Sequence, residues 1–269
     1  AIQTQFHHMI RTIPSNGYVI YPAGNENIQQ VITQGCWSQM QTFADQTWSE
    51  GEPNWRYRLL ENDGSSFEVS DADKNVAEVN WPHGGLHNVQ NALGAIAAAS
   101  TAGVSLGVAC EALCGFIGVK RRMEVIYEDE RLAIYDDFAH HPTAIKTTLE
   151  GLRAKVGDDQ VIAIVEPRSA TMKMGLHQGV LSGAVDCADV ALWYKSSAVN
   201  WDIQSVAAGC AIPALVCDDI EQLLASTLEN LDSQQLNGKQ LSADKKSHIV
   251  IMSNGSFEGF HQRLVGVVQ

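Results

Sequence analysis

Basic residues are scarce in this sequence. Its 269 residues include 18 Lys and Arg against 31 Asp and Glu, a formal net charge of −13 at pH 7. This excess of negative charge repels a phosphate backbone, so we expect no nucleic-acid partner. Small molecules are the expected partners, and an anionic substrate would need Arg or Lys side chains placed at its own site.

Long apolar segments are also missing. A membrane-spanning helix needs a run of about 18 apolar residues, which the chain lacks, and no signal peptide opens it. We therefore expect no membrane insertion and a cytoplasmic location. The chain begins without Met, inside an amphipathic segment at residues 1–6, and this indicates a fragment of a longer protein.

The sequence also lacks a zinc-binding pattern of cysteines and a glycine-rich phosphate-binding loop. The six cysteines are scattered, mostly in apolar runs, as is typical of free thiols in a reducing compartment. Cys110 and Cys114 share a helix face, but no other Cys or His pair has zinc spacing, so we favour core packing and assign no metal ligand.

The loop G-x-x-x-x-G-K-S/T is absent, so the chain by itself lacks the usual cradle for nucleotide β and γ phosphates.

The length predicts two units, because single domains usually have about 100 to 200 residues. The first unit should contain short helices near residues 2–12 and 28–32 and a strand at 18–21. Alternating residues from Cys36 to Trp81 predict an antiparallel flap with two hairpin turns, at residues 62–64 and 71–73. Two helices follow, at residues 87–101 and 104–116. Residues 118–122 should form the hinge, so the units are residues 1–119 and 120–269.

Strands and helices alternate after Met123, which predicts an α/β unit with a mostly parallel sheet covered on both faces. The first two strands are separated by a few residues and should pair antiparallel. The predicted strands are Glu124–Tyr127, Leu132–Tyr135, Val161–Val165, Val190–Tyr194, Ala214–Cys217 and His248–Met252.

The stretch YDDFAHHP at residues 135–142 carries the densest chemistry. It ends a predicted strand and runs into a helix that begins at Pro142, and ligands of open α/β sheets bind at such corners. Asp136 and Asp137 could hold a ribose hydroxyl or Mg²⁺, and His140 and His141 could donate to a phosphate or titrate near neutral pH. The alternative is a solvated polar turn.

Three other groups lie where they could meet the same ligand. Arg168 and Lys173 follow the strand at 161–165, where a guanidinium can grip a carboxylate, or simply pair with a nearby Glu. Ser253 and Asn254 follow the last strand, although many such loops contain Ser and Asn. The basic run at residues 120–122 could clamp phosphates or be an ordinary solvated face.

Asn88 and Asn91 open the long helix of the first unit. Asn91 lies one turn further on and could hydrogen-bond a base edge, whereas a capping or surface role is the simpler interpretation.

Several motifs together resemble the Mur ligases in order and spacing. They are LHNVQNAL at residues 86–93, RRME at 121–124 and YDDFAHHPT at 135–143. EPRS at 166–169, TMKMG at 171–175 and MSNG at 252–255 look most like the family members that act on a murein tripeptide. The resemblance covers essentially the whole chain.

The resemblance implies the back portion of a central ATP-binding domain at residues 1–119 and a complete, Rossmann-like carboxy-terminal domain at 120–269. An amino-terminal UDP-sugar domain, the P-loop and the metal ligands would precede Ala1. The implied reaction joins L-alanyl-γ-D-glutamyl-meso-diaminopimelate to UDP-N-acetylmuramate with ATP and Mg²⁺, in peptidoglycan recycling and cell-wall biogenesis. The muramoyl carboxylate attacks the γ-phosphate, and the tripeptide amine then displaces phosphate from the acyl phosphate.

The resemblance also implies roles for single residues. Asn91, with Asn88, would meet the adenine, Arg122 would reach ATP, and Asp137 would bind the ribose. His140 would lie near the γ-phosphate, and His140 or His141 is our hypothesis for the base that takes the proton of the amine. The residues that would face the incoming tripeptide are Arg168, Lys173, Ser253 and Asn254.

Two non-enzymatic alternatives remain open at this point. In a receiver-like signalling module, an acidic pair would bind Mg²⁺ and a further Asp would accept phosphate, with Asp218, Asp219 and Lys195 as the available partners. A binding-only domain would keep the nucleotide contacts without turnover. If the ligase interpretation is right, we expect this chain alone to show no ligase turnover.

Overall fold

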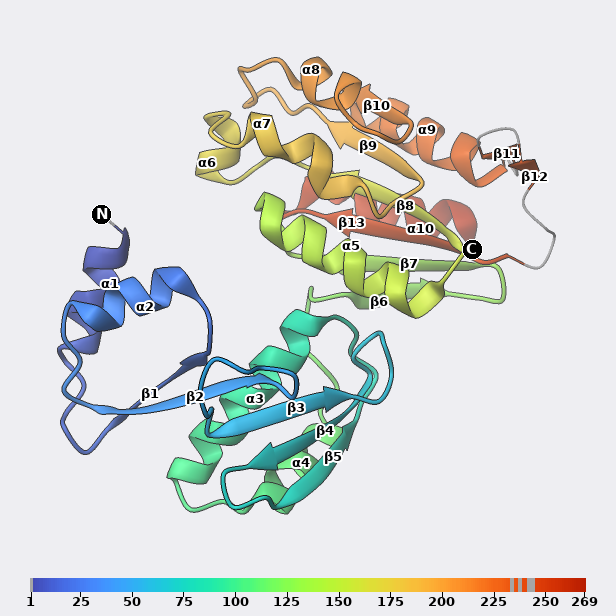
Figure 1. The fold of residues 1–269 in the computed structure, drawn as a ribbon. Coiled ribbons are helices and arrows are strands. Elements are labelled where there is room, and N and C mark those ends of the chain that lie inside the picture. The colour runs from blue at the N-terminus through green and yellow to red at the C-terminus, as the bar shows by residue number, and fades with distance from the viewer. Residues whose placement is uncertain (1, 233–234, 237–238, 241–244) are drawn as a thin grey trace. The chain divides into compact units, whose positions relative to one another are not determined.

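The protein folds as two units, which the chain forms in succession: Ala1–Ile117 and Gly118–Gln269. The structure, a computed structural model, describes residues 2–232, 235–236, 239–240 and 245–269 (Figure 1). No helix in these ranges is both long and apolar enough to cross a membrane.

The first unit contains a mixed five-stranded sheet in the order β1-β2-β3-β4-β5. The strands are β1 (Tyr18–Pro22), β2 (Gln39–Asp45), β3 (Trp55–Leu59), β4 (Ser66–Asp71) and β5 (Val76–Asn80). The last three pair antiparallel, which confirms both predicted hairpins. The prediction of an antiparallel flap is wrong for β2, which pairs in parallel with β1 and β3. Alternation determines which side chains face the core and says nothing about the direction of a neighbouring strand.

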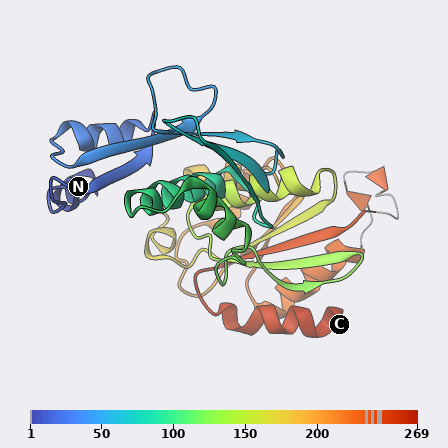
Figure 2. The same cartoon turned by 90° about the horizontal axis from the view of Figure 1, so that it is seen from below.

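Helices α3 (Leu86–Thr101) and α4 (Leu106–Cys114) cover one face of this sheet (Figure 2). Val89, Leu93 and Ile96 recur at helical spacing and are buried against Phe67. Helices α1 (Ile2–Ile10) and α2 (Glu26–Thr33) contribute to a smaller, separate apolar cluster.

The second unit contains a six-stranded sheet in the order β10-β9-β8-β13-β7-β6. All neighbours pair in parallel except β6 and β7, which are antiparallel, and this confirms the sequence-based sheet. The strands are β6 (Glu124–Glu128), β7 (Leu132–Asp137), β8 (Gln160–Val165), β9 (Val190–Tyr194), β10 (Ala214–Cys217) and β13 (Ser247–Met252). A short antiparallel pair, β11 (Gln235–Leu236) and β12 (Lys239–Gln240), lies outside this sheet.

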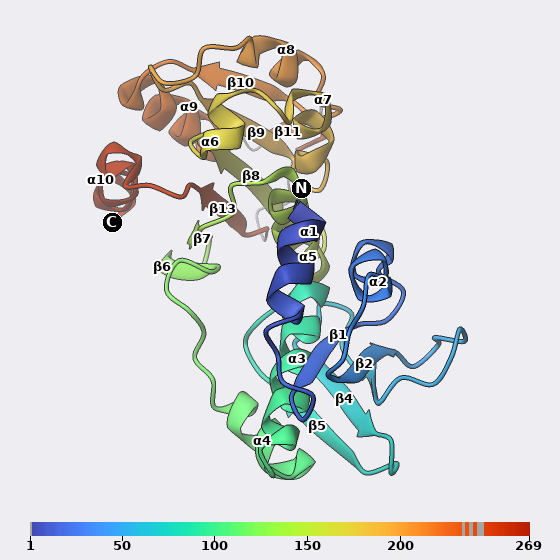
Figure 3. The ribbon, with the colours of Figure 1, turned by 90° about the vertical axis from the view of Figure 1, so that its left-hand side faces the viewer.

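Helices cover both faces of this sheet (Figure 3). One face carries α5 (Pro142–Val156), α6 (Ala170–Lys173), α7 (Gln178–Leu181), η1 (Ser182–Val185) and α8 (Ile203–Ala208). The other carries α9 (Ile220–Asp232), η2 (Phe257–Gly259) and α10 (Phe260–Val268).

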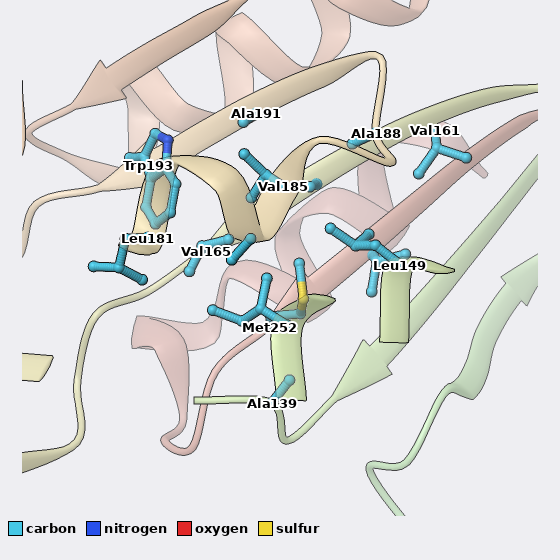
Figure 4. Packing of buried hydrophobic residues seen from close by; sticks show 14 of the residues in the cluster. Ala139, Leu149, Val161, Val165, Leu181, Val185, Ala188, Ala191, Trp193 and Met252 are labelled. Atoms are coloured by element: carbon cyan, nitrogen blue, oxygen red, sulfur yellow. The ribbon is translucent and has the colours of Figure 1, made fainter. Parts of the chain in front are cut away.

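Burial on both faces explains why the strands are continuously apolar. In β8, Val161 and Val165 pack toward α5 and η1 (Figure 4), whereas Ile162 and Ile164 pack toward α9 and α10. Each such side chain contributes about 1.5–3 kcal/mol when fully buried. The central strands are therefore packed on both faces, and this packing fixes the positions at which the loops after them begin.

Candidate functional site

Three neighbouring strands end at the same level of the sheet. Met252 is the register partner of both Asp137 in β7 and Val165 in β8. The next backbone bonds tie the strand ends together: Ser253 N donates to Asp137 O at 3.1 Å, and Glu166 N donates to Met252 O at 3.0 Å. The structure thus brings the predicted groups at residues 136–141, 166–173 and 253–254 to one edge of the second unit.

Asp137 is 3% exposed, and local donors largely occupy its carboxylate. Oδ1 accepts hydrogen bonds from Ala139 N at 2.8 Å and Thr148 Oγ1 at 3.4 Å, and Oδ2 accepts one from Met123 N at 2.9 Å. These bonds turn the chain at the end of β7. A carboxylate oxygen has two lone pairs, and Oδ2 has one donor among the described residues.

Asp136 and Arg121 form an ion pair within the second unit. The Arg121 guanidinium lies 3.1 Å from Asp136 Oδ2 through Nε, and its Nη2 donates to Ser253 O at 2.7 Å and Gly255 O at 2.9 Å. His261 Nε2 is 3.2 Å from Asp136 Oδ1. Burial raises the pKa of Asp136, but the hydrogen bonds and charges of His261 and Arg121 outweigh it, so the pKa falls below its ordinary value.

This ion pair corrects two expectations from the sequence. Arg121 is not available to clamp phosphates, because its guanidinium is directed to a carboxylate and two carbonyls of its own unit. Asp136 is likewise engaged and does not offer a free carboxylate to ribose or Mg²⁺. Arg122, by contrast, is exposed, with its guanidinium carbon 5.4 Å from the centre of the Phe138 ring.

The two adjacent histidines make different hydrogen bonds. His140 Nδ1 lies 2.8 Å from Phe138 O, and since a carbonyl only accepts, Nδ1 carries the proton and Nε2 is left as a base. His141 caps helix α5: its Nδ1 accepts from Thr143 N at 3.2 Å, so its proton is on Nε2. Burial, then the charges of His177 and His140, lower the pKa of His141.

Arg168 lies beside the buried carboxylate of Glu166, the kind of pairing that the sequence left open as the simpler alternative. Glu166 is 3% exposed and accepts a hydrogen bond from Ser253 Oγ, and its Oε1 is 3.9 Å from Arg168 Nη1. The Arg168 side chain is 40% exposed, so part of its guanidinium faces solvent. Ser169 Oγ donates to His140 O at 3.3 Å, which links this loop to the loop after β7.

The remaining predicted residues are less constrained. Lys173 ends the short helix α6 and is half-buried. Asn254 is also half-buried, and its Oδ1 accepts no hydrogen bond from any described residue. In the first unit, Asn88 Nδ2 donates to Gly84 O at 2.7 Å, in the turn before α3, whereas Asn91 is exposed on α3.

Other parts of this edge carried no sequence signal. Phe257, Glu258 and Gly259 have successive positive φ angles of 48°, 50° and 78°, which reverse the chain before α10. Glu258 accepts a hydrogen bond from Tyr194 OH at 2.9 Å. Positive φ is unusual for Phe and Glu, and such backbone is often found at functional sites.

The receiver-like alternative does not fit the sheet. Asp218 and Asp219 follow β10, four strand positions from β7 in the order β10-β9-β8-β13-β7. At about 4.8 Å per strand, they lie roughly 19 Å from Asp137, too far to share one ion with it. Asp219 also caps α9, with its Oδ1 accepting from Gln222 N at 2.7 Å.

The described His, Cys, Asp and Glu side chains form no cluster of metal donors. In the ranges that the structure describes, no group of three or more His, Cys, Asp or Glu side chains is arranged to hold a metal ion. We assign the described residues no step that acts through a metal.

The chain is similar to characterised protein families. Residues 121–237 match the family model "Mur ligase, glutamate ligase domain". A UDP-N-acetylmuramate–L-alanyl-γ-D-glutamyl-meso-2,6-diaminoheptandioate ligase of Haemophilus influenzae is 40% identical over 266 residues, which cover 98% of this chain and 55% of the relative. The Escherichia coli ligase of the same name is 38% identical, with 98% and 54% covered.

A solved structure supports the same similarity. A crystal structure of a murein peptide ligase from Psychrobacter arcticus superposes with a TM-score of 0.71 at 41% identity, covering 99% of this chain and 54% of that one. The chain thus spans about half the length of the curated relatives it matches.

Proposed function

The chain belongs to the Mur ligase family, and from this premise we propose that it is part of an ATP-dependent ligase that forms an amide bond. The substrates would be UDP-N-acetylmuramate and L-alanyl-γ-D-glutamyl-meso-diaminopimelate, in peptidoglycan recycling in the cytoplasm. The main support is the 40% identity over nearly the whole chain to a ligase named for those substrates.

We propose the following contacts with the nucleotide. In the first unit, Asn91, with Asn88, would meet the adenine. In the second, Arg122 would contact ATP and Asp137 would accept a hydrogen bond from the ribose, using the second lone pair of Oδ2. ATP supplies the phosphoryl group that activates the muramoyl carboxylate. Since the chain has no P-loop, another part of the longer protein would hold the β and γ phosphates and Mg²⁺.

The loops after β8 and β13 are the proposed peptide site. The tripeptide carries carboxylates, and the exposed part of the Arg168 guanidinium can accept one in a two-point contact. Lys173, Ser253 and Asn254 would complete the site. Ser253 directs its hydroxyl to Glu166, so its contribution to the peptide would come through the backbone of the loop that it shapes. Positioning and charge complementarity would supply most of the rate.

His140 is the proposed base for the attacking amine. Its Nδ1–H is held by Phe138 O, which leaves Nε2 to take a proton, whereas His141 uses its lone pair to cap α5. His140→Ala in the full-length protein should lower kcat by at least about tenfold, within the usual range for general base catalysis. A rate within about threefold of wild type would reject this role. The matched variant His141→Asn keeps the cap and should keep the rate.

The function itself is tested with the full-length protein. ATP, Mg²⁺, UDP-N-acetylmuramate and the tripeptide should give phosphate and the amide product, measured by phosphate release and mass spectrometry. Free L-alanine in place of the tripeptide should give much less product. Nucleotide binding without product under these conditions would favour the binding-only alternative. The 269-residue chain alone should give no product, and turnover by it would contradict the proposed division of the site.

A further inference from the structure

Gly255 lies directly against the guanidinium of Arg168. A Cβ added at this glycine would collide with Nη1, Cζ and Nε of Arg168. Nε and Nη1 are both bonded to Cζ, so all three atoms belong to the plane of the guanidinium group. Their similar distances from the added Cβ show that this plane lies against the backbone of the loop after β13. Only a residue without a side chain permits so close an approach.

The backbone conformation does not explain why this residue is glycine. Among the residues that the structure describes, ten other glycines have positive φ angles, whereas Gly255 does not. Its backbone is therefore open to alanine, and the clash with Arg168 is the specific obstacle. The nearby Gly259, at φ 78°, is the glycine in this turn that the backbone conformation favours.

Hydrogen bonds hold Gly255 in place from two directions. Its N–H donates to Ser253 Oγ at 3.0 Å, and its carbonyl accepts from Arg121 Nη2 at 2.9 Å. Ser253 Oγ in turn donates to the buried Glu166, and Arg121 is paired with Asp136. The loop cannot retreat from a new methyl group without breaking these bonds, so Arg168 would have to move instead.

Arg168 has few other restraints. Its nearest acidic atom, Glu166 Oε1, is 3.9 Å away, beyond a good hydrogen bond, and its side chain is 40% exposed. The flat contact with Gly255 therefore does much to set the plane of the guanidinium. A carboxylate binds an arginine in that plane, with two parallel N–H···O bonds.

We propose that Gly255 is a positioning residue for substrate recognition, whose missing side chain lets Arg168 lie in the orientation that receives a carboxylate of the peptide substrate. This inference rests on the proposed function, since it supposes a peptide carboxylate at Arg168. Arg121 and Ser253 serve the same purpose indirectly, because they hold Gly255.

The test compares Gly255→Ala, Arg168→Ala and the double variant in the full-length protein, with Gly266→Ala as matched control. Gly266 lies on α10 with nothing within 4 Å of an added Cβ. Loss of a charge-assisted contact corresponds to about tenfold to a hundredfold in affinity, so Gly255→Ala should raise KM for the tripeptide by that factor. KM for ATP, kcat and the thermal midpoint should follow the control.

The double variant separates positioning from general damage. If Gly255 acts through Arg168, adding Gly255→Ala to Arg168→Ala should have no further effect on KM. Effects that multiply, or a Gly255→Ala enzyme that matches Gly266→Ala, would overturn the proposal.

A second measurement does not depend on turnover. In NMR spectra of the protein, the Arg168 guanidinium should show hindered rotation in wild type and faster rotation in Gly255→Ala. Equal rotation in the two proteins would refute the positioning role. Absence of turnover by the wild type with this contrast intact would instead count against the proposed function alone.

Discussion

Arg121 and Arg153 serve similar structural purposes at opposite ends of the second unit's sheet. Each side chain is 26% exposed, and each joins a carboxylate to backbone carbonyls. Arg153 pairs with Asp189 at 2.7 Å and donates to the carbonyls of Gly157, Asp159 and Cys187. Arg121 pairs with Asp136 and donates to the carbonyls of Ser253 and Gly255.

The difference lies in what each arginine holds. The polar groups around Arg153 form hydrogen bonds with one another. Asp189 Oδ2 also accepts a hydrogen bond from Val161 N at 2.8 Å, at the amino end of β8. Around Arg121, the loop that it holds carries Gly255, against which the partly exposed Arg168 lies. The same kind of contact therefore supports stability at the amino edge and the geometry of the proposed site at the carboxyl edge.

The largest expected effect is on stability at the amino edge. Arg153→Ala removes the side-chain donor of three carbonyls and one of the two donors to Asp189. It should lower the free energy of unfolding by about 3 kcal/mol, since each lost partner of a partly buried group costs about 1 kcal/mol. KM for the proposed substrates should not change. Urea unfolding measures the first and steady-state kinetics the second.

Lys155→Ala on the same helix is the matched control, because Lys155 is exposed and its loss should change stability by less than about 0.5 kcal/mol. An Arg153→Ala protein as stable as this control would remove one side of the comparison.

Arg121→Ala should have a smaller effect on stability and a second effect that Arg153→Ala lacks. Loss of two carbonyl contacts and the Asp136 pair should lower the free energy of unfolding by about 2 kcal/mol. KM for the tripeptide should also rise, because the loop at Gly255 is released. Arg121→Lys keeps the charge but cannot span all three acceptors, so it should recover little of the KM effect. Unchanged KM in both variants would make the two arginines equivalent.

His141 permits a smaller test at the start of α5. His141→Ala removes the cap on Thr143 N and should lower the free energy of unfolding by about 1 kcal/mol, the usual cost of a lost N-cap. Asn is a strong N-cap, so His141→Asn should restore stability. Circular dichroism melts of the two variants measure the difference, and equal melts would show that the hydrogen bond contributes nothing.

The sequence predicted the sheet of the second unit, and the edge of that sheet at which the candidate residues gather. Continuous apolar runs such as Val190–Tyr194 mark strands buried on both faces, and polar residues directly after them mark the carboxyl edge. The helix beginning at Pro142 was equally clear, since proline at that position fits a first helical turn.

The sequence could not reveal which hydrogen-bond or ion-pair partner each polar side chain has in the folded protein. Arg121 and Arg122 are neighbours in a basic run, yet one is turned to Asp136 and the other is exposed. His140 and His141 are identical in type, and only their acceptor and donor neighbours assign the protons. The orientation of Arg121 depends in part on Ser253, which lies 132 positions away in the sequence, so a local pattern cannot predict it. The two histidines bond to groups only two residues away, but the path of the turn decides which group each ring meets, and residue type does not reveal that path.

The smallest expected effect is a pH dependence at the amino edge. His248 in β13 is 5% exposed, with Nδ1 3.1 Å from Tyr135 OH and Nε2 3.3 Å from Asp159 Oδ2. Burial lowers the pKa of His248 below its ordinary 6.5, and Asp159 only partly offsets this. Burial also raises the pKa of Tyr135 to about 12, so the phenol stays neutral.

Because the folded protein disfavours the charged form of His248, the unfolded chain binds the proton first as the pH falls. Stability from this group is complete above the ordinary pKa of 6.5 and is lost as the pH falls below it toward the folded pKa. One proton corresponds to at most about 1.4 kcal/mol per pH unit, and we expect His248→Gln to reduce the loss between about pH 7 and pH 5.5 by roughly 1 kcal/mol or less. His141 titrates in the same direction in both proteins, so it cancels in the comparison. Urea unfolding at several pH values measures the two profiles, and parallel profiles would show that the amino edge is insensitive to pH in this range.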